Sequence, residues 1–197
     1  MTSKKNKGSK YKWVAFVSLW TFVLSVFITI ASEVLLENIK SFILSVILLL
    51  IIIVVGVIFD TIGIAAAAAE EVPFHAKAAK KVTGARQAIF LIRNADQVAN
   101  FCNDVVGDIS GIVSGVIGAA IIFRFVAEEP AVDRAVLSVV MTGIIASLTV
   151  GGKAIGKMVA LDKANAIIHL VSVVMIRFDR LLPGVFPVSN KVNKKRK

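Results

Sequence analysis

Three aspartates lie inside long apolar segments, and they are the residues of this sequence whose types and spacing could do chemistry. Asp60 is the only charge in the run 41–69, while Asp104 and Asp108 are the only charges between Gln97 and Phe123. An ionisable group inside a membrane costs several kcal/mol and usually faces a partner, water or an ion. Because Mg²⁺ prefers oxygen ligands and often takes one or two carboxylates, these residues predict a site for a hard cation.

The spacing of these residues predicts how they would meet. Asp104 and Asp108 are four residues apart, which places them on one face of an α-helix. Asn103 and Ser110 add oxygen atoms nearby. If the helix that carries Asp60 runs antiparallel to this one, Asp60 can face the other two. Carboxylates held together in this way need a countercharge, or one of them must stay protonated.

Two other roles stay open for the aspartates. Asp104 and Asp108 could lie near the cytoplasmic end of their helix, where they would cap it and pair with Arg93 or a lysine. A relay that passes protons along the carboxylates is the remaining alternative.

The composition indicates which elements must position these side chains. The chain has 197 residues, of which 57% are hydrophobic and 18% charged, against about 45–50% and 25% in a soluble domain. This composition argues against a soluble enzyme, a disordered chain and a collagen-like repeat. Because a bilayer core needs about 20 apolar residues per helix, we expect four transmembrane helices, at 13–32, 41–69, 97–123 and 135–152. The first exceeds the hydrophobic region of a signal peptide and is expected to remain as an anchor.

Two further segments are predicted to be helical but too polar to span. Residues 74–96 are rich in alanine and lysine and are interrupted by Gly84, which predicts a hairpin of two short helices. Residues 164–182 carry polar side chains on one helical face and end before Pro183, which predicts a juxtamembrane helix lying at the membrane interface. The expected fold class is therefore an all-α integral membrane protein with a cytoplasmic helical hairpin and an interfacial helix.

The net charge of +10 is explained by topology. The N-terminal tail, the segment 70–96 and the chain after residue 152 carry 20 of the 23 Lys and Arg residues. An excess of Lys and Arg marks the cytoplasmic face. We therefore expect a multi-pass protein of the plasma or inner membrane with both termini cytoplasmic, attracted to anionic lipid. No nucleic-acid-binding motif accompanies the basic tail, so no nucleic-acid partner is expected.

The sequence contains no pattern typical of an enzyme. It has no nucleophile elbow, phosphate-binding loop, H-E-x-x-H or CxxC motif. His75 and His169 lack partners at a metal-ligand spacing, and Cys102 is expected to be a small apolar residue. Small residues recur at Gly107, Gly111 and Gly115, a spacing that lets helices pack closely in a dimer or against a neighbouring span.

Three motifs in sequence give the chain a resemblance to a known family. Residues 59–65 read F-D-T-I-G-I-A, residues 105–108 read V-V-G-D, and residues 152–160 read G-K-A-I-G-K-M-V-A. Over Ile43–Pro183 the layout resembles the transmembrane domain of the cyclin-M and CorB/CorC magnesium transporters. The corresponding family patterns are F-S-G-S-E-x-A, L-I-G-N and G-E-x-x-P-K-x-x-A.

The resemblance implies specific roles. Asp60 takes the position of the first serine and Asp108 that of the asparagine, while Asn103 fits the asparagine in another register. The family's two glutamates fall on Gly63 and Lys153. The resemblance thus implies a homodimer that binds, and could transport, Mg²⁺ or a similar divalent cation. Its metal ligands would be Asp60, Asp108, Asp104 and Asn103.

The same comparison supports an alternative. Lys153 reverses a charge of the family pattern, and no nucleotide-binding CBS domain follows the juxtamembrane helix in this sequence. The alternative is a membrane scaffold or accessory subunit that keeps the fold without transport. The resulting domain scheme is a basic tail with an anchor at 1–40, a transporter-like domain at 41–183 and a basic tail at 184–197.

Overall fold

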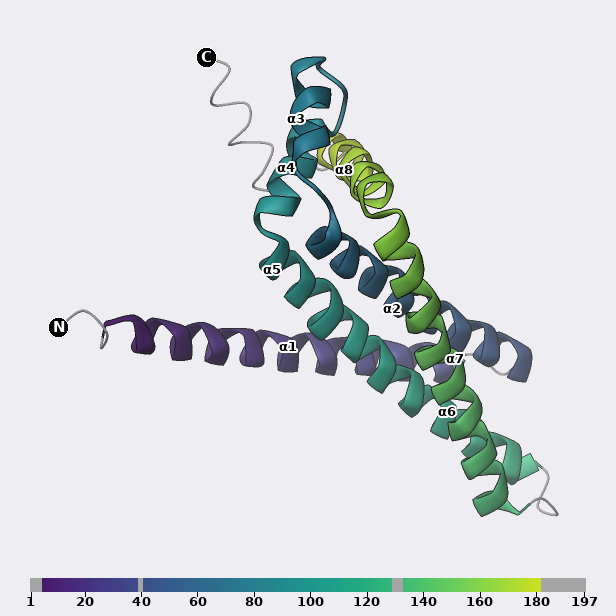
Figure 1. The fold of residues 1–197 in the computed structure, drawn as a ribbon. Coiled ribbons are helices and arrows are strands. Elements are labelled where there is room, and N and C mark those ends of the chain that lie inside the picture. The colour runs from purple at the N-terminus through teal and green to yellow at the C-terminus, as the bar shows by residue number, and fades with distance from the viewer. Residues whose placement is uncertain (1–4, 39–40, 129–132, 182–197) are drawn as a thin grey trace. The chain divides into compact units, whose positions relative to one another are not determined.

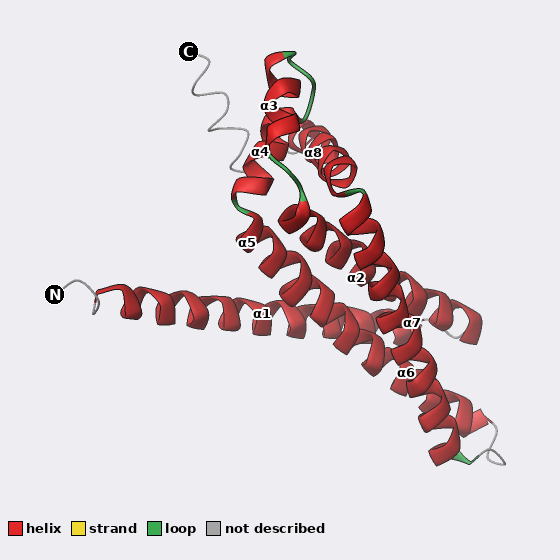
Figure 2. Cartoon of the chain, in the orientation of Figure 1, coloured by secondary structure: helices red, strands yellow, loops and turns green. Residues whose placement is uncertain are grey.

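The computed structural model describes residues 5–38, 41–128 and 133–181, and these form helices joined by short loops (Figures 1 and 2). The helices in chain order are α1 (Lys5–Asn38), α2 (Phe42–Ala68), α3 (Val72–Ala79), α4 (Ala85–Arg93), α5 (Ala95–Ala99), η1 (Asn100–Gly107), α6 (Asp108–Glu128), α7 (Arg134–Asp162) and α8 (Ala164–Leu181). The predicted all-α class is confirmed for these residues. The basic tail predicted at 184–197 lies outside them.

Three stretches of helix are long and apolar enough to cross a membrane. They are Phe42–Ala68, Ala95–Ala127 and Arg134–Asp162, and they coincide with the second, third and fourth predicted spans. The first predicted span lies within α1, where the side chains described include a shorter apolar stretch, Ser18–Val34. A membrane environment is therefore supported by three helices, and the fourth span stays a prediction.

The chain divides into two compact units. The first contains the residues up to Ile53 together with Ile109–Ile145. In it, the rings of Phe42 and Phe125 lie 5.8 Å apart. The Arg134 guanidinium lies 3.8 Å from the centre of the Phe123 ring, a cation–π contact between α6 and α7.

The glycines of α6 differ in whether they pack against another helix of the chain. A methyl group on Gly118 would overlap Ile145 of α7, so this glycine serves a contact within the chain. Gly111 and Gly115 have no atom of another part of the described chain within 4 Å of such a methyl group. Within the described part of the chain, no side chain packs directly on these two glycines.

The second unit contains residues 54–108 and the chain from Ala146 onward, and it holds the candidate site. Its hydrophobic core joins the end of α2, the α3–α4 hairpin, the end of α7 and α8. Phe74 of α3 and Ile168 of α8 are fully buried there, against small residues of α2, α4 and α7, which are Ala65, Ala66, Ala88 and Ala160. Alanines at these contacts let the helices approach closely around one phenylalanine.

The predicted hairpin is confirmed, and Gly84 makes its turn possible. α3 begins with a proline in its first turn, where the missing N–H costs nothing. Gly84 precedes α4 with a φ of 89°, a left-handed conformation that favours glycine. The Arg93 side chain then joins the two helices through bonds of 2.7 Å to the Glu71 carboxylate.

The helix predicted at residues 164–182 is also present, as α8. Asn165 in its first turn accepts a 3.0 Å hydrogen bond from the backbone N–H of Glu70, which follows the end of α2. Ser172 is fully buried and donates back to the Ile168 carbonyl at 2.7 Å. The placement of this helix at the membrane interface stays a prediction.

One element was not predicted by the sequence. Residues Asn100–Gly107 form a π-helix, in which each N–H bonds five residues back rather than four. The expected alignment of Asp104 with Asp108 assumed an α-helix, so the wider turn changes which residues share a face. π-helical turns occur frequently at functional sites, and this one carries Asn103 and Asp104.

Candidate cation site

The ammonium of Lys153 lies between two of the predicted ligands. Its Nζ is 3.7 Å from Asp60 Oδ1 and 3.4 Å from Asp108 Oδ1, and it donates a hydrogen bond to the latter. Asp60 belongs to α2, Asp108 begins α6 and Lys153 lies in α7. Three segments that are distant in the sequence thus meet at one charged cluster.

Burial differs sharply across this cluster. The Asp60 side chain is 13% exposed and that of Lys153 27%, whereas the Asp108 side chain is 66% exposed. The cluster therefore has an interior end at Asp60 and an open end at Asp108. With two carboxylates and one ammonium, its formal charge is one negative unit.

Glycines bring α7 onto α2 at this point. A methyl group on Gly152 would come within 2.8 Å of Val57, and one on Gly156 would overlap the Thr61 hydroxyl. That hydroxyl donates to the Val57 carbonyl at 2.7 Å and so is held against its own helix. The close approach places Lys153, the residue after Gly152, beside Asp60.

Gly107 lies beside the ion pair. A methyl group there would lie 3.4 Å from Asp60 Oδ1 and 3.5 Å from Lys153 Nζ. It would also lie 3.3 Å from the Cys102 carbonyl, the one contact of the three that is closer than an ordinary van der Waals distance. The last residue of the π-helix thus lies within contact distance of both charged groups.

Asn103 of η1 packs against Gly63, which lies about one helical turn after Asp60 in α2. A methyl group on Gly63 would overlap Asn103 Oδ1, which is buried and has no hydrogen-bond partner among the described residues. A buried carbonyl oxygen without a partner carries a cost of about 1–3 kcal/mol. It is also an oxygen of the type that binds a hard cation.

Asp104 stands apart from the cluster. Its side chain is exposed and forms no ion pair or hydrogen bond within the described part of the chain. Of the four predicted ligands, the structure thus joins Asp60 and Asp108 through Lys153 and places Asn103 nearby. Among the described residues, no group of three or more His, Cys, Asp or Glu side chains is arranged to hold a metal ion.

The sequence left open which basic residue would pair with the aspartates. Arg93 is engaged with Glu71 at 2.7 Å, and Lys153 is the partner of Asp108. The packing role of Gly152 and Gly156 was not predicted. Their four-residue spacing, typical of close helix contacts in membranes, could have indicated it.

No protein-family model matches this chain, and no similar protein was found among the curated proteins or the solved structures.

Proposed function

We propose that this multi-pass membrane protein binds a divalent cation such as Mg²⁺ between Asp60 and Asp108, and that the Lys153 ammonium holds this place until the ion displaces it. The observation that carries the proposal is the position of Lys153 Nζ, 3.7 Å and 3.4 Å from the two carboxylates. A site that holds one cationic group has the charge and the oxygen atoms to hold another.

The charges of the cluster suit such an exchange. When Lys153 withdraws, two carboxylates remain, and their charge matches that of a divalent ion. Asn103 Oδ1, buried without a partner near Asp60, is the third candidate ligand. Because Mg²⁺ keeps several of its waters, two or three protein oxygens suffice.

The open end at Asp108 gives the ion its route of entry. Asp108 is 66% exposed and Asp60 13%, so an ion would meet Asp108 first and reach Asp60 as the lysine leaves. In transport, the ion would pass through a polar cleft between the transmembrane helices that carry the cluster. We place both termini and the hairpin on the cytoplasmic side of the plasma or inner membrane, following the distribution of Lys and Arg.

The same ion pair favours a second function. Lys153 satisfies both aspartates without any metal, as it would in a scaffold or accessory subunit that has lost transport. In that function, a second copy or another membrane protein would pack on α6 at Gly111 and Gly115. A homodimer is compatible with either function.

The test is Mg²⁺ binding to the purified full chain in detergent, measured by calorimetry. Lys153→Met removes the competing ammonium while keeping an unbranched side chain of similar length. We expect this variant to bind Mg²⁺ at least about tenfold more tightly than the original chain, which corresponds to about 1.4 kcal/mol. Asp60→Asn in the Lys153→Met background should abolish the gain.

Lys157→Met is the matched control, because Lys157 is exposed and lies one turn further along α7. It should leave Mg²⁺ affinity unchanged. Absence of saturable binding in both the original chain and Lys153→Met would reject the cation site and leave the scaffold function. If Lys153→Met does bind, flux of Mg²⁺ into liposomes decides between binding alone and transport.

A further inference from the structure

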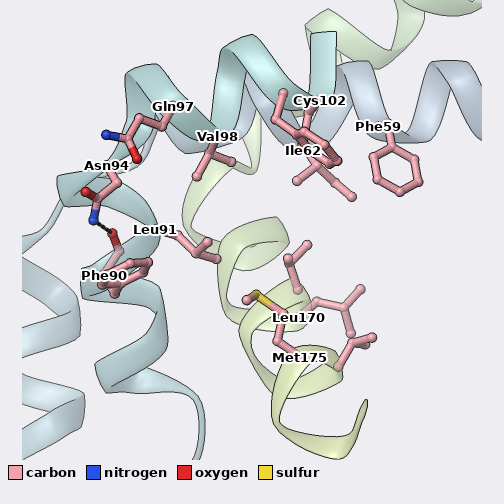
Figure 3. Close-up of a pocket in the computed structure, with 13 residues that line it drawn as sticks. Phe59, Ile62, Phe90, Leu91, Asn94, Gln97, Val98, Cys102, Leu170 and Met175 are labelled. Atoms are coloured by element: carbon pink, nitrogen blue, oxygen red, sulfur yellow. Dashed lines mark hydrogen bonds between the residues drawn. The ribbon is translucent and has the colours of Figure 1, made fainter. Parts of the chain in front are cut away.

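The second unit contains an apolar pocket that the cation site does not use. It has a volume of about 580 Å³ and is lined by side chains of α2, α4, α5, η1 and α8 (Figure 3). Phe59 and Ile62 form one wall, Val98 and Cys102 the roof, and Leu170 and Met175 the floor. A cavity of this size, with mainly apolar walls and a few polar groups, is typical of a ligand site.

Water is a poor occupant of this pocket. Asn94 and Gln97 supply the polar side chains of its lining, and the Asn94 amide already donates to the Phe90 carbonyl at 2.7 Å. A bound water needs two to four polar partners, which the remaining walls do not offer. Phe101 and Leu170 line the pocket and are 48% and 64% exposed, so the pocket opens to the molecular surface.

The position of the pocket along the membrane spans indicates where an apolar ligand would come from. Phe59 and Ile62 lie in the last three turns of the span Phe42–Ala68, whereas Val98 and Cys102 lie near the start of the span Ala95–Ala127. Consecutive spans cross in opposite directions, so the end of one and the start of the next reach the same membrane surface. In a bilayer crossed by these two spans, the pocket would lie at the level where lipid acyl chains join their headgroups.

The helices around the pocket also carry a charge that selects among lipids. α4 and α8 contain Arg86, Arg177 and Arg180 against one acidic residue, Asp179, besides Arg93, which is paired with Glu71. Arg177 follows the lining residue Val174 by three positions, which places the two on one face of α8. Arg177 is exposed and forms no ion pair among the described residues. Basic residues beside an apolar pocket complement an anionic headgroup.

We propose that this pocket binds one acyl chain of an anionic phospholipid, with Arg177 attracting the headgroup. Asn94 and Gln97 lie at the polar end of the pocket, away from Phe59 (Figure 3). The acyl chain enters past the amides and ends against the rings and aliphatic side chains of α2 and η1. The proposal is independent of the cation site, since none of Asp60, Asp108 and Lys153 lines the pocket.

The first test is native mass spectrometry of the full chain in detergent, titrated with phosphatidylglycerol or phosphatidylcholine. The original chain should retain one phosphatidylglycerol in preference to phosphatidylcholine. Val174→Trp places a large ring in the pocket and should weaken retention by more than about tenfold, because excluding even two methylene groups has this effect. Arg177→Gln should remove the preference for phosphatidylglycerol while keeping lipid binding.

Leu161→Trp is the matched control, because Leu161 is an exposed apolar residue of α7 outside the pocket. It should retain lipid as the original chain does. Equal retention by Val174→Trp and the original chain would overturn the proposal. The proposal would also be overturned if Val174→Trp lost a dimer but retained lipid unchanged, because the pocket would then be occupied by a second copy of the chain.

A second measurement needs no variant. Cys102 is the single cysteine of the chain, lines the pocket and is 6% exposed, so a maleimide label reports on access to the pocket. Adding phosphatidylglycerol to delipidated protein should slow labelling at least about tenfold, the same factor as the loss of lipid retention expected for Val174→Trp. An unchanged labelling rate at saturating lipid would contradict the proposal.

Discussion

Lys153 Nζ lies 3.7 Å from Asp60 Oδ1, inside the helix packing of the second unit. The contact to Asp108 is shorter, at 3.4 Å, but Asp108 is 66% exposed and Asp60 only 13%. Burial should outweigh distance here, because water screens an exposed pair and leaves a buried one strong. Asp60 is therefore the partner that matters more for folding, and Asp108 the one that an incoming ion can reach.

The two aspartates should differ in their effect on stability. Asp60→Asn removes the buried partner of Lys153 and leaves it only the exposed Asp108 carboxylate. We expect a loss of about 2–3 kcal/mol, below the 3–5 kcal/mol of a fully buried pair that loses its one partner. Asp108→Asn should cost less than about 1 kcal/mol, as exposed pairs do. Chemical unfolding of both variants in detergent micelles measures the difference. Equal losses of unfolding free energy would show that burial does not decide which of the two contacts contributes more to stability.

Replacing Gly63 tests the close approach of α2 and η1. Gly63→Ala places a methyl group on Asn103 Oδ1, and overpacking of this kind costs about 1–3 kcal/mol. Gly151→Ala is the control, since nothing lies within 4 Å of its new methyl group. Alanine should stabilise α7 there by about 0.5–1 kcal/mol. Thermal unfolding should show opposite signs for the two variants, and the same sign would refute the contact.

The turn of the hairpin gives a backbone prediction. Gly84 has a φ of 89°, and a side chain there would also meet Val173 at 3.0 Å. Gly84→Ala should destabilise the hairpin by at least about 1–2 kcal/mol, the cost of the left-handed region for other residues. Thr83→Ala, an exposed neighbour in the same turn, should have little effect. Hydrogen exchange of the α3 and α4 amides compares the two, and equal protection would exclude a strained turn.

The hairpin should also loosen in acid. The hydrogen bond from Arg93 holds the pKa of Glu71 below its ordinary value of 4.5, with a further contribution from His75. Because the pKa is lower in the folded state, this stabilisation is complete above pH 4.5 and is lost as the pH falls through the lowered value. The protection factors of the α3 and α4 amides, which compare their exchange rates with those of unprotected amides at the same pH, should therefore fall below pH 4.5.

Two neighbouring glutamates make this acid response specific. Glu71→Gln should remove this acid-induced loss of protection, because no carboxylate remains to be protonated beside Arg93. Glu70→Gln should keep it, since the contact of Glu70 with Asn165 is made by its backbone N–H. An identical pH profile in Glu71→Gln and the original chain would assign the effect to another group.

Much of the fold follows from local patterns in the sequence. Apolar runs predicted the three spans at α2, α5–α6 and α7, because length and hydropathy alone suffice for a helix in lipid. Gly84 predicted the break between α3 and α4, since glycine is the residue that tolerates a positive φ. The π-helix at Asn100–Gly107 could not be predicted, because its hydrogen bonds shift by one residue without a change in composition.

The sequence by itself determined that Asp60 and Asp108 are charges in apolar surroundings and therefore need a partner. It could not determine which one, since several basic residues were equally available. The tertiary structure decided for Lys153, because Gly152 and Gly156 let α7 approach α2 closely enough for its ammonium to reach both carboxylates. Pairing across helices depends on distances between backbones, and these are fixed by packing rather than by spacing along the chain.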